Sequence, residues 1–172
     1  LMLCDYVKKH KMDICIHAVH VNHMIRQEAA DDENFTRKLC ESVGVDCYAA
    51  HIDCIGIARE KGLTVEEAGR LERYRIFDEI AKKYKDDGGV MIAVAHHMND
   101  QAETVLMNMA RGTSLKGVRG IVPVRDNICR PLLCITRGQI ESVLSAKDQP
   151  YVTDVTNFDN DYTRNAIRNV IL

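Results

Sequence analysis

The feature that most constrains the fold is an apolar run that passes directly into a polar cluster and then into a helix. Residues 90–95 are all apolar and predict a buried strand. His96, His97 and Asp100 follow at once, and residues 102–110 have helical periodicity. In open α/β sheets, ligands bind where parallel strands end. The sequence therefore predicts a ligand site at this strand–helix junction.

Strands and helices alternate along the rest of the chain, which predicts βαβ units and a doubly wound parallel α/β sheet. Further strands are expected over 14–21, 46–52 and 128–133. Helices are expected over 2–11, 27–43, 64–84, 100–110, 136–147 and 162–172, with a loop over 112–127 and an extended segment over 151–156. Thr64 is the expected N-cap of the long helix, with Glu66 and Glu67 in its first turn.

Composition narrows the class of protein. The 172 residues fit one domain, and 46% hydrophobic residues can supply its core. A net charge of −2 means that any RNA contact is local rather than global. No apolar run approaches the roughly 20 residues of a membrane helix, and no signal peptide is visible. Seven cysteines without a CxxC pair indicate reduced thiols, so we expect a cytoplasmic protein without a membrane partner.

The polar cluster belongs to a longer pattern, HHxxDxxETxxxxxxRG, which runs from His96 to Gly112. Other segments accompany it in order: His20–Arg26, Glu67–Arg70 with Arg73 and Tyr74, Arg130–Leu133, and Arg164–Asn165 with Arg168. Together they resemble the tRNA(Ile)-lysidine synthetases of the N-type ATP-pyrophosphatase superfamily. The resemblance implies an adenine-nucleotide alpha-hydrolase-like (Rossmann-like) fold.

The same resemblance implies an activity, its cofactors and its partners. The activity is ATP-dependent ligation of L-lysine to the wobble cytidine of tRNA(Ile) with a CAU anticodon, through an adenylated cytidine, with Mg²⁺ at the phosphates. Residues 1–172 are expected to be a partial N-terminal catalytic domain. The first strand and a phosphate loop of the type SGGxDS are expected before Leu1, and a tRNA-binding region after the chain. A homodimer is one expected assembly.

The resemblance also assigns roles to individual residues. Asp100, Glu103 and Arg70 are the expected catalytic residues, and Asp100 is the expected metal ligand. Glu103 with Asp100 suits the ammonium group of lysine, and Arg70 suits a phosphate or a carboxylate. The expected nucleotide-binding residues are His20, Val21, Asn22, His96 and His97. The expected tRNA-binding residues are Arg111, Lys116, Arg130, Arg164 and Arg168.

Several of these residues have a second interpretation. The two histidines and Asp100 are also zinc-ligand types, and Asp100 and Glu103 also suit a helix N-terminus. Residues 112–120 form either a surface loop or a mobile segment that meets tRNA, and they lack the Lys-Ser or Lys-Thr of a Walker A loop. The arginines also suit structural salt bridges. Gly69 stands where the family motif usually has alanine. In a helix, glycine is less stable than alanine by about 1 kcal/mol.

Two other functions fit the pattern less completely. A tRNA thiolase of the same superfamily adenylates a base and then transfers sulfur. Such enzymes commonly carry CxxC pairs or an active-site cysteine, and this chain has no CxxC pair. A nucleotide-binding module without catalysis is the alternative from another class. The segment upstream of Leu1 discriminates an enzyme from the binding module, since an SGGxDS loop there favours an enzyme.

Overall fold

A computed structural model describes residues 1–25, 29–85 and 88–152, apart from the side chains of residues 115 and 116. The chain divides into two compact units, Leu1–Tyr84 and Lys85–Leu172, each with its own internal packing. Arg26, Arg164, Arg168 and the helix expected over 162–172 lie outside the described residues.

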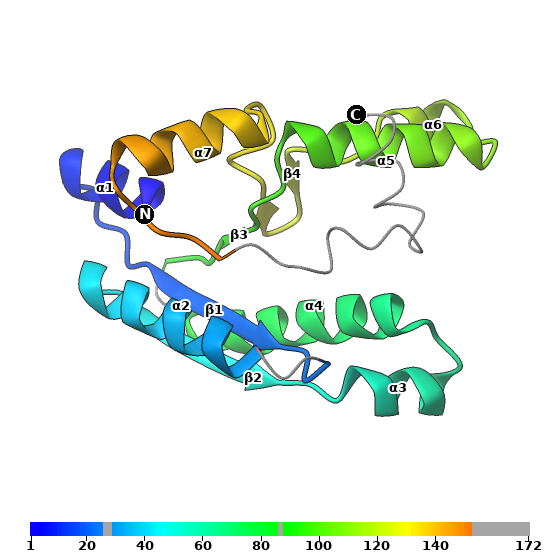
Figure 1. The fold of residues 1–172 in the computed structure, drawn as a ribbon, viewed down its shortest axis with the longest axis horizontal. Helices are drawn as coiled ribbons and strands as arrows, with labels where there is room; N and C mark the ends of the chain where they lie inside the picture. Colours follow the sequence, from blue (N-terminus) through cyan, green and yellow to red (C-terminus); the bar gives the residue numbers. More distant parts are fainter. Residues whose placement is uncertain (26–28, 86–87, 153–172) are drawn as a thin grey trace. The chain divides into compact units, whose positions relative to one another are not determined.

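The first unit is built on two parallel strands, β1 (His17–Asn22) and β2 (Asp46–His51) (Figure 1). Their register pairs His17 with Asp46 at one end and Asn22 with His51 at the other. Both predicted strands are confirmed. The first was predicted to begin at Ile14, whereas β1 begins at His17.

Helices cover both faces of this sheet, because successive side chains of a strand point to opposite sides. The even-numbered residues His20 and Asn22 meet α2 (Ala29–Val43). The odd-numbered residues Val19 and Val21 pack against a core of Ile52, Cys54 and Ile76, of which Ile76 belongs to α4 (Val65–Lys83). Hydrophobic burial on the α4 side therefore fixes which polar residues face α2.

The remaining helices of the first unit are α1 (Met2–Lys9) and α3 (Cys54–Lys61). The α3 helix was not predicted, although Asp53 caps its first turn through Gly56 N at 2.8 Å and Gly62 ends it with a φ of 63°. Lys61 Nζ lies 3.1 Å from Glu72 Oε1 and ties α3 to α4. The predicted cap of α4 is confirmed, since the Thr64 hydroxyl accepts from Glu67 N and the Glu67 carboxylate accepts from Thr64 N.

The second unit contains a small mixed sheet of order β3–β5–β4. Strand β3 (Ile92–Ala93) runs parallel to β5 (Ile128–Cys129), and β4 (Val124–Arg125) is antiparallel to β5. Its helices are α5 (Met98–Ala110), α6 (Leu115–Val118) and α7 (Arg137–Ala146). The expectation of a plain loop over 112–127 was wrong: α6 and β4 lie in it, and Asp126, with a φ of 55°, forms the turn into β5.

Candidate functional site

The carboxyl end of β1 is organised by the Asn22 side chain. Asn22 is buried, and its Oδ1 accepts a hydrogen bond from Met24 N at 2.9 Å. Its Nδ2 donates to Ala29 O at 3.3 Å and to Glu33 Oε2 at 3.4 Å. The expected nucleotide-binding residue therefore shapes the turn that leaves β1, and its amide is occupied within the unit.

Glu33 connects that turn to β2. Its carboxylate accepts two bonds from the Arg37 guanidinium at 3.0 Å and lies 2.9 Å from His51 Nε2. Burial acts to raise the pKa of Glu33, but the hydrogen bonds from Arg37 and Asn22 outweigh it, so the pKa falls below its usual value. Glu33 thus remains a carboxylate that holds the β1 and β2 ends together.

His20 and Val21 lie on opposite faces of β1. The Thr36 hydroxyl donates to Asp32 O at 2.8 Å, so at 3.4 Å from His20 Nδ1 it serves as an acceptor. The His20 Nδ1 atom therefore carries the proton. Val21 packs against the core, so any contact it makes with a nucleotide comes from its backbone.

His23, the next histidine of the same motif, lies between a thiol and a guanidinium. Arg73 Nη2 donates to His23 Nε2 at 3.0 Å, and His23 Nδ1 lies 3.1 Å from the fully buried Cys54 Sγ. Because a guanidinium only donates, Nδ1 carries the proton and bonds the sulfur. Desolvation, followed by the charges of Arg73 and His20, lowers the pKa of His23 and keeps it neutral.

Gly69 of the α4 motif lies against this group, and Arg70 is the next residue of the helix. A Cβ atom at Gly69 would lie 3.3 Å from Cys54 Sγ and 3.3 Å from His23 Nδ1, so glycine leaves room for the contact. Arg70, an expected catalytic residue, is exposed, and its guanidinium carbon lies 5.6 Å from the centre of the Tyr74 ring. The α4 side of β1 therefore ends in a positively charged surface formed by Arg70 and Arg73.

In the second unit, Asp100 and Glu103 are both buried on α5, and Glu103 has no exposed surface. Asp100 Oδ2 accepts a hydrogen bond from His97 N at 2.9 Å and lies 3.5 Å from His97 Nδ1. The backbone bond caps the start of α5. His96, His97, Asp100 and Glu103 thus lie between the end of β3 and the first turns of α5, and the contacts described join His97 to Asp100.

The carboxylates of this group are of a type that Mg²⁺ accepts as ligands. Within the described ranges, no three His, Cys, Asp or Glu side chains are arranged to hold a metal. Mg²⁺ needs fewer protein ligands, because it keeps several waters and is commonly bound by one or two carboxylates together with substrate phosphates. One oxygen of Asp100 is engaged by His97 N, and the carboxylate as a whole suits this role.

The segment after α5 is bound to the helix. Gln101 bridges it, donating to Arg119 O at 2.9 Å and accepting from Ile121 N at 2.5 Å. Asn108 Nδ2 donates to Gly117 O at 2.7 Å, and α5 and α6 lie side by side (Figure 1). Arg111 is exposed at the end of α5, whereas the Lys116 side chain lies outside the described residues.

Arg130, an expected tRNA-binding residue, is buried. It is 7% exposed, its Nη1 donates to Val122 O at 2.8 Å, and its backbone N donates to Pro123 O. This geometry gives Arg130 a structural role in holding residues 122–123 against β5. Nearby, Arg137 N donates to Asn99 Oδ1 at 3.0 Å and links α7 to the start of α5.

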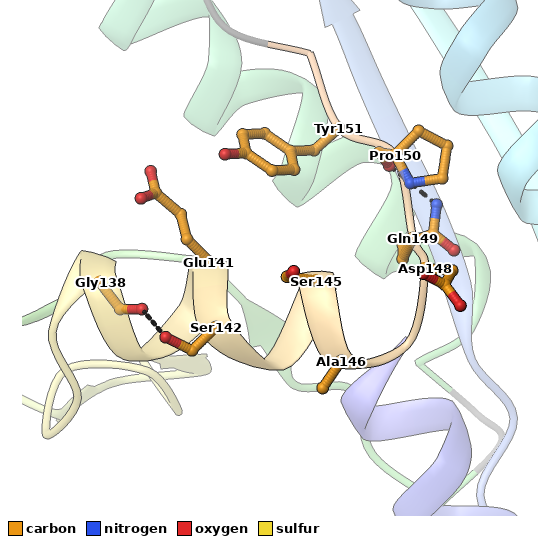
Figure 2. A pocket seen from close by; sticks show the side chains of 9 residues that line it. All are labelled: Gly138, Glu141, Ser142, Ser145, Ala146, Asp148, Gln149, Pro150 and Tyr151. Carbon is orange, nitrogen blue, oxygen red and sulfur yellow. Dashed lines mark hydrogen bonds between the residues drawn. The ribbon is translucent and has the colours of Figure 1, made fainter.

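Figure 2 shows a shallow, open hollow along α7, with the Glu141 and Tyr151 side chains on the same side of the helix. Its lining residues are Gly138, Glu141, Ser142, Ser145, Ala146, Asp148, Gln149, Pro150 and Tyr151. None of the residues that the sequence marks as functional is among them.

The whole chain, residues 1–172, matches the PP-loop domain. The chain belongs to the PP-loop domain family. The parallel pairs β1–β2 and β3–β5, with helices between the strands, agree with this assignment. The predicted adenine-nucleotide alpha-hydrolase-like fold is confirmed.

Relatives of this PP-loop domain include several tRNA(Ile)-lysidine synthases. It is 44% identical over 162 residues to that of Clostridium acetobutylicum and 45% identical over 161 residues to that of Caldanaerobacter subterraneus subsp. tengcongensis, in both cases over 93% of this chain. The match to the Thermosipho africanus synthase is 42% over 152 residues and 88% of this chain. The chain spans about a third of these relatives, 34%, 34% and 35% of their respective lengths.

A solved structure supports the fold. The U34-tRNA thiolase NcsA from Methanococcus maripaludis, with its [4Fe-4S] cluster, matches with a TM-score of 0.63 over 96% of this chain and 64% of that chain. Its sequence identity is 16%, so the likeness concerns the fold. Across the described residues, no helix combines the length and the apolar character that a bilayer crossing requires.

Sequence reasoning missed several residues that organise the site. Cys54, Glu33 and Gln101 were not singled out, although each anchors a predicted residue or segment. Gln101 lies inside the recognised motif, which was its only signal. Cys54 and Glu33 act across gaps of 31 and 11 residues in sequence, so local patterns carry no sign of them.

Proposed function

We propose that the full-length protein is a cytoplasmic tRNA(Ile)-lysidine synthase that joins L-lysine to the wobble cytidine of tRNA(Ile) with a CAU anticodon. Identity of 44% to a synthase of that name over 93% of this chain carries the proposal. The group at the start of α5 supports it, because the motif residues His96, His97, Asp100 and Glu103 lie together there.

The reaction has two steps. The cytidine C2 oxygen first attacks the α-phosphorus of ATP and releases pyrophosphate. The lysine ε-amine then attacks C2 of the adenylated base and releases AMP. Mg²⁺, when bound with ATP, neutralises phosphate charge.

In this proposal the chain's own residues bind and orient the reactants. Asp100 provides the carboxylate for the divalent cation, and Glu103 meets the lysine ammonium before it loses its proton. His20, Val21 and Asn22 at the end of β1 bind the nucleotide in this proposal, and so do His96 and His97 ahead of α5. Arg70 offers its exposed guanidinium to a phosphate or to the lysine carboxylate.

The tRNA surface belongs to the same proposal. Arg111 is exposed and suits a phosphate contact, and Lys116, Arg164 and Arg168 are further candidates by position in the motifs. Arg130 is assigned a supporting role, because its side chain is buried and bonded to Val122 O.

The test is incorporation of labelled L-lysine into a tRNA(Ile) transcript by the full-length protein with ATP and Mg²⁺. We expect incorporation into the CAU transcript and none into a matched transcript with uridine at the wobble position. AMP and pyrophosphate should form in step with lysidine. Transfer of sulfur from a donor, without lysine incorporation, would favour the thiolase alternative. ATP binding without either product would favour a nucleotide-binding module.

A further inference from the structure

The face of β1 that meets α4 carries a cysteine–histidine contact at each end. His23 and Cys54 form one at the carboxyl end. At the amino end, Cys15 Sγ lies 3.4 Å from His17 Nε2. Residues two apart in an extended chain point to the same side, which brings this second pair together.

The pairing of β1 with β2 places Asp46 beside the Cys15–His17 pair. His17 is paired with Asp46 across β1 and β2, and His17 Nδ1 lies 3.6 Å from Asp46 Oδ2. The imidazole therefore lies between the Cys15 thiol on one nitrogen and the Asp46 carboxylate on the other. A thiol within hydrogen-bond reach of an imidazole is the nucleophile and base pairing used in nucleophilic catalysis. The Asp46 carboxylate lies at ion-pair distance from His17 without a hydrogen bond to Nδ1, so it acts on the ring through its charge.

Aromatic residues hold the imidazole in this position. The Tyr84 ring stacks on His17 with centroids 4.4 Å apart and planes at 22°. The Tyr84 hydroxyl is hydrogen-bonded to that of Tyr48, which raises the pKa of Tyr84 to about 12 and keeps its phenol uncharged. A positive charge also lies near these rings, since Lys83 Nζ is 5.3 Å from the centre of the Tyr48 ring.

We propose that Cys15 is a nucleophilic thiol activated by His17, and that it forms a mixed disulfide with small aliphatic disulfides. Nε2 of His17 takes the thiol proton, and Asp46 stabilises the resulting imidazolium. The Cys15 sulfur attacks one sulfur of R–S–S–R, a new S–S bond forms and the old one breaks. The departing thiolate takes the proton from His17 and leaves as R–SH, so one thiol is oxidised and one is formed.

Comparison with other cysteines shows why Cys15 is the reactive one. Cys54 also contacts a histidine, but it is fully buried, and burial raises its thiol pKa. Cys40 is buried, and burial followed by the neighbouring Cys47 raises its pKa to about 11. Cys134 is exposed like Cys15, but its thiol lies 3.9 Å from Pro131 O. Among these thiols, Cys15 combines exposure with a histidine within hydrogen-bond reach.

The experiment exposes the reduced full-length protein to oxidised glutathione and measures each modified cysteine by mass spectrometry over time. Cys134 is the internal reference, because it shares the exposure of Cys15. We expect Cys15 to react about tenfold faster than Cys134 near neutral pH, as general-base activation requires. Equal rates for the two thiols would overturn the proposal.

Two variants identify the source of that difference. His17→Gln should bring the Cys15 to Cys134 ratio close to one. Asp46→Asn should lower the ratio by about twofold to threefold, since an exposed charge acts weakly. The Asp46 side chain is 80% exposed, so this variant tests the arrangement even where His17→Gln disturbs the packing against Tyr84.

His10→Gln is the matched control, because His10 follows the end of α1 and its ring contacts the Tyr6 ring, with centroids 4.3 Å apart. It should leave the ratio unchanged. Circular dichroism confirms that each variant is folded. A ratio that stays at its original value in both His17→Gln and Asp46→Asn would overturn the role of His17. Because the readout is thiol modification, its outcome is independent of lysidine formation.

Discussion

Gly69 lies against the Cys54 thiol, since a Cβ atom at position 69 would come within 3.3 Å of Sγ. Glycine destabilises a helix by about 1 kcal/mol relative to alanine. Gly69 is nevertheless present at a buried position of α4. The space that it leaves is occupied by the contact between Cys54 and His23.

We therefore expect Gly69→Ala to raise the free energy of unfolding by less than the difference in helix propensity between the two residues. In a Cys54→Ala background the added methyl has more room, and the same change should stabilise by about 1 kcal/mol relative to that background. Denaturant unfolding of the four proteins in this cycle measures the coupling between the two positions. Equal effects of Gly69→Ala in both backgrounds would show that the sulfur does not constrain position 69.

Asp100→Asn should abolish lysine incorporation while leaving the fold intact. Asparagine keeps a side-chain oxygen that can accept from His97 N, as Asp100 Oδ2 does at 2.9 Å, but it removes the charge that a divalent cation needs. The assay is lysidine formation by the full-length protein, with a melting curve beside it. Near-normal turnover by the folded variant would exclude Asp100 as the metal ligand.

Glu103→Gln should raise the KM for lysine and leave ATP binding unchanged. A charge-assisted hydrogen bond contributes about 1.5–3 kcal/mol, which corresponds to a rise of about tenfold to a hundredfold. Steady-state kinetics with varied lysine, and calorimetry with ATP, separate the two effects. A lysine KM equal to that of the wild type would remove Glu103 from the amino-acid site.

Acid should destabilise the protein partly through His23. Its pKa is lowered in the folded protein by desolvation and then by Arg73, so the unfolded chain binds the proton more readily. Stability from this group is therefore complete above its unfolded value of about 6.5 and is lost as the pH falls below it. His23→Gln should lose less stability than the wild type between pH 7.5 and pH 5.5, measured by denaturant unfolding. Parallel curves for both proteins would contradict this assignment.

Gly120→Ala should detach the segment after α5. Gly120 has a φ of 64°, and a Cβ there would lie 2.7 Å from Gln101 Oε1. We expect a loss of about 1–2 kcal/mol, since alanine is strained in the left-handed region and the Gln101 bridge is broken. Gly138→Ala is the control, because nothing lies within 4 Å of its Cβ, and it should be neutral or slightly stabilising. Equal effects of both substitutions on the melting temperature would contradict the role of Gln101.

Local signals in the sequence predicted the elements that position the site. The Thr64 cap, the β1 and β2 strands and the α5 helix follow from capping residues and hydrophobic period. The short elements α3, α6 and β4 were missed, because elements of two to eight residues carry little periodicity.

Side-chain partners were less predictable than elements. The contact between Arg73 and His23 joins residues 50 apart, and packing of α4 on the sheet determines it. The burial of Arg130 was likewise hidden, since an arginine in a recognised motif looks the same whether it meets tRNA or a backbone carbonyl. Local patterns thus identified candidate residues but not the atoms that those residues engage.

The alternation of side chains along β1 has a consequence for changes in its length. His17, Val19, Val21 and His23 all face α4, so one inserted or deleted residue within the strand would move everything beyond it to the other face. Such a change would place a valine beside Glu33 and a polar side chain in the core. The two ends of β1 are therefore coupled by parity: the histidine at either end can keep its partners only if the two sequence positions differ by an even number, as 17 and 23 do.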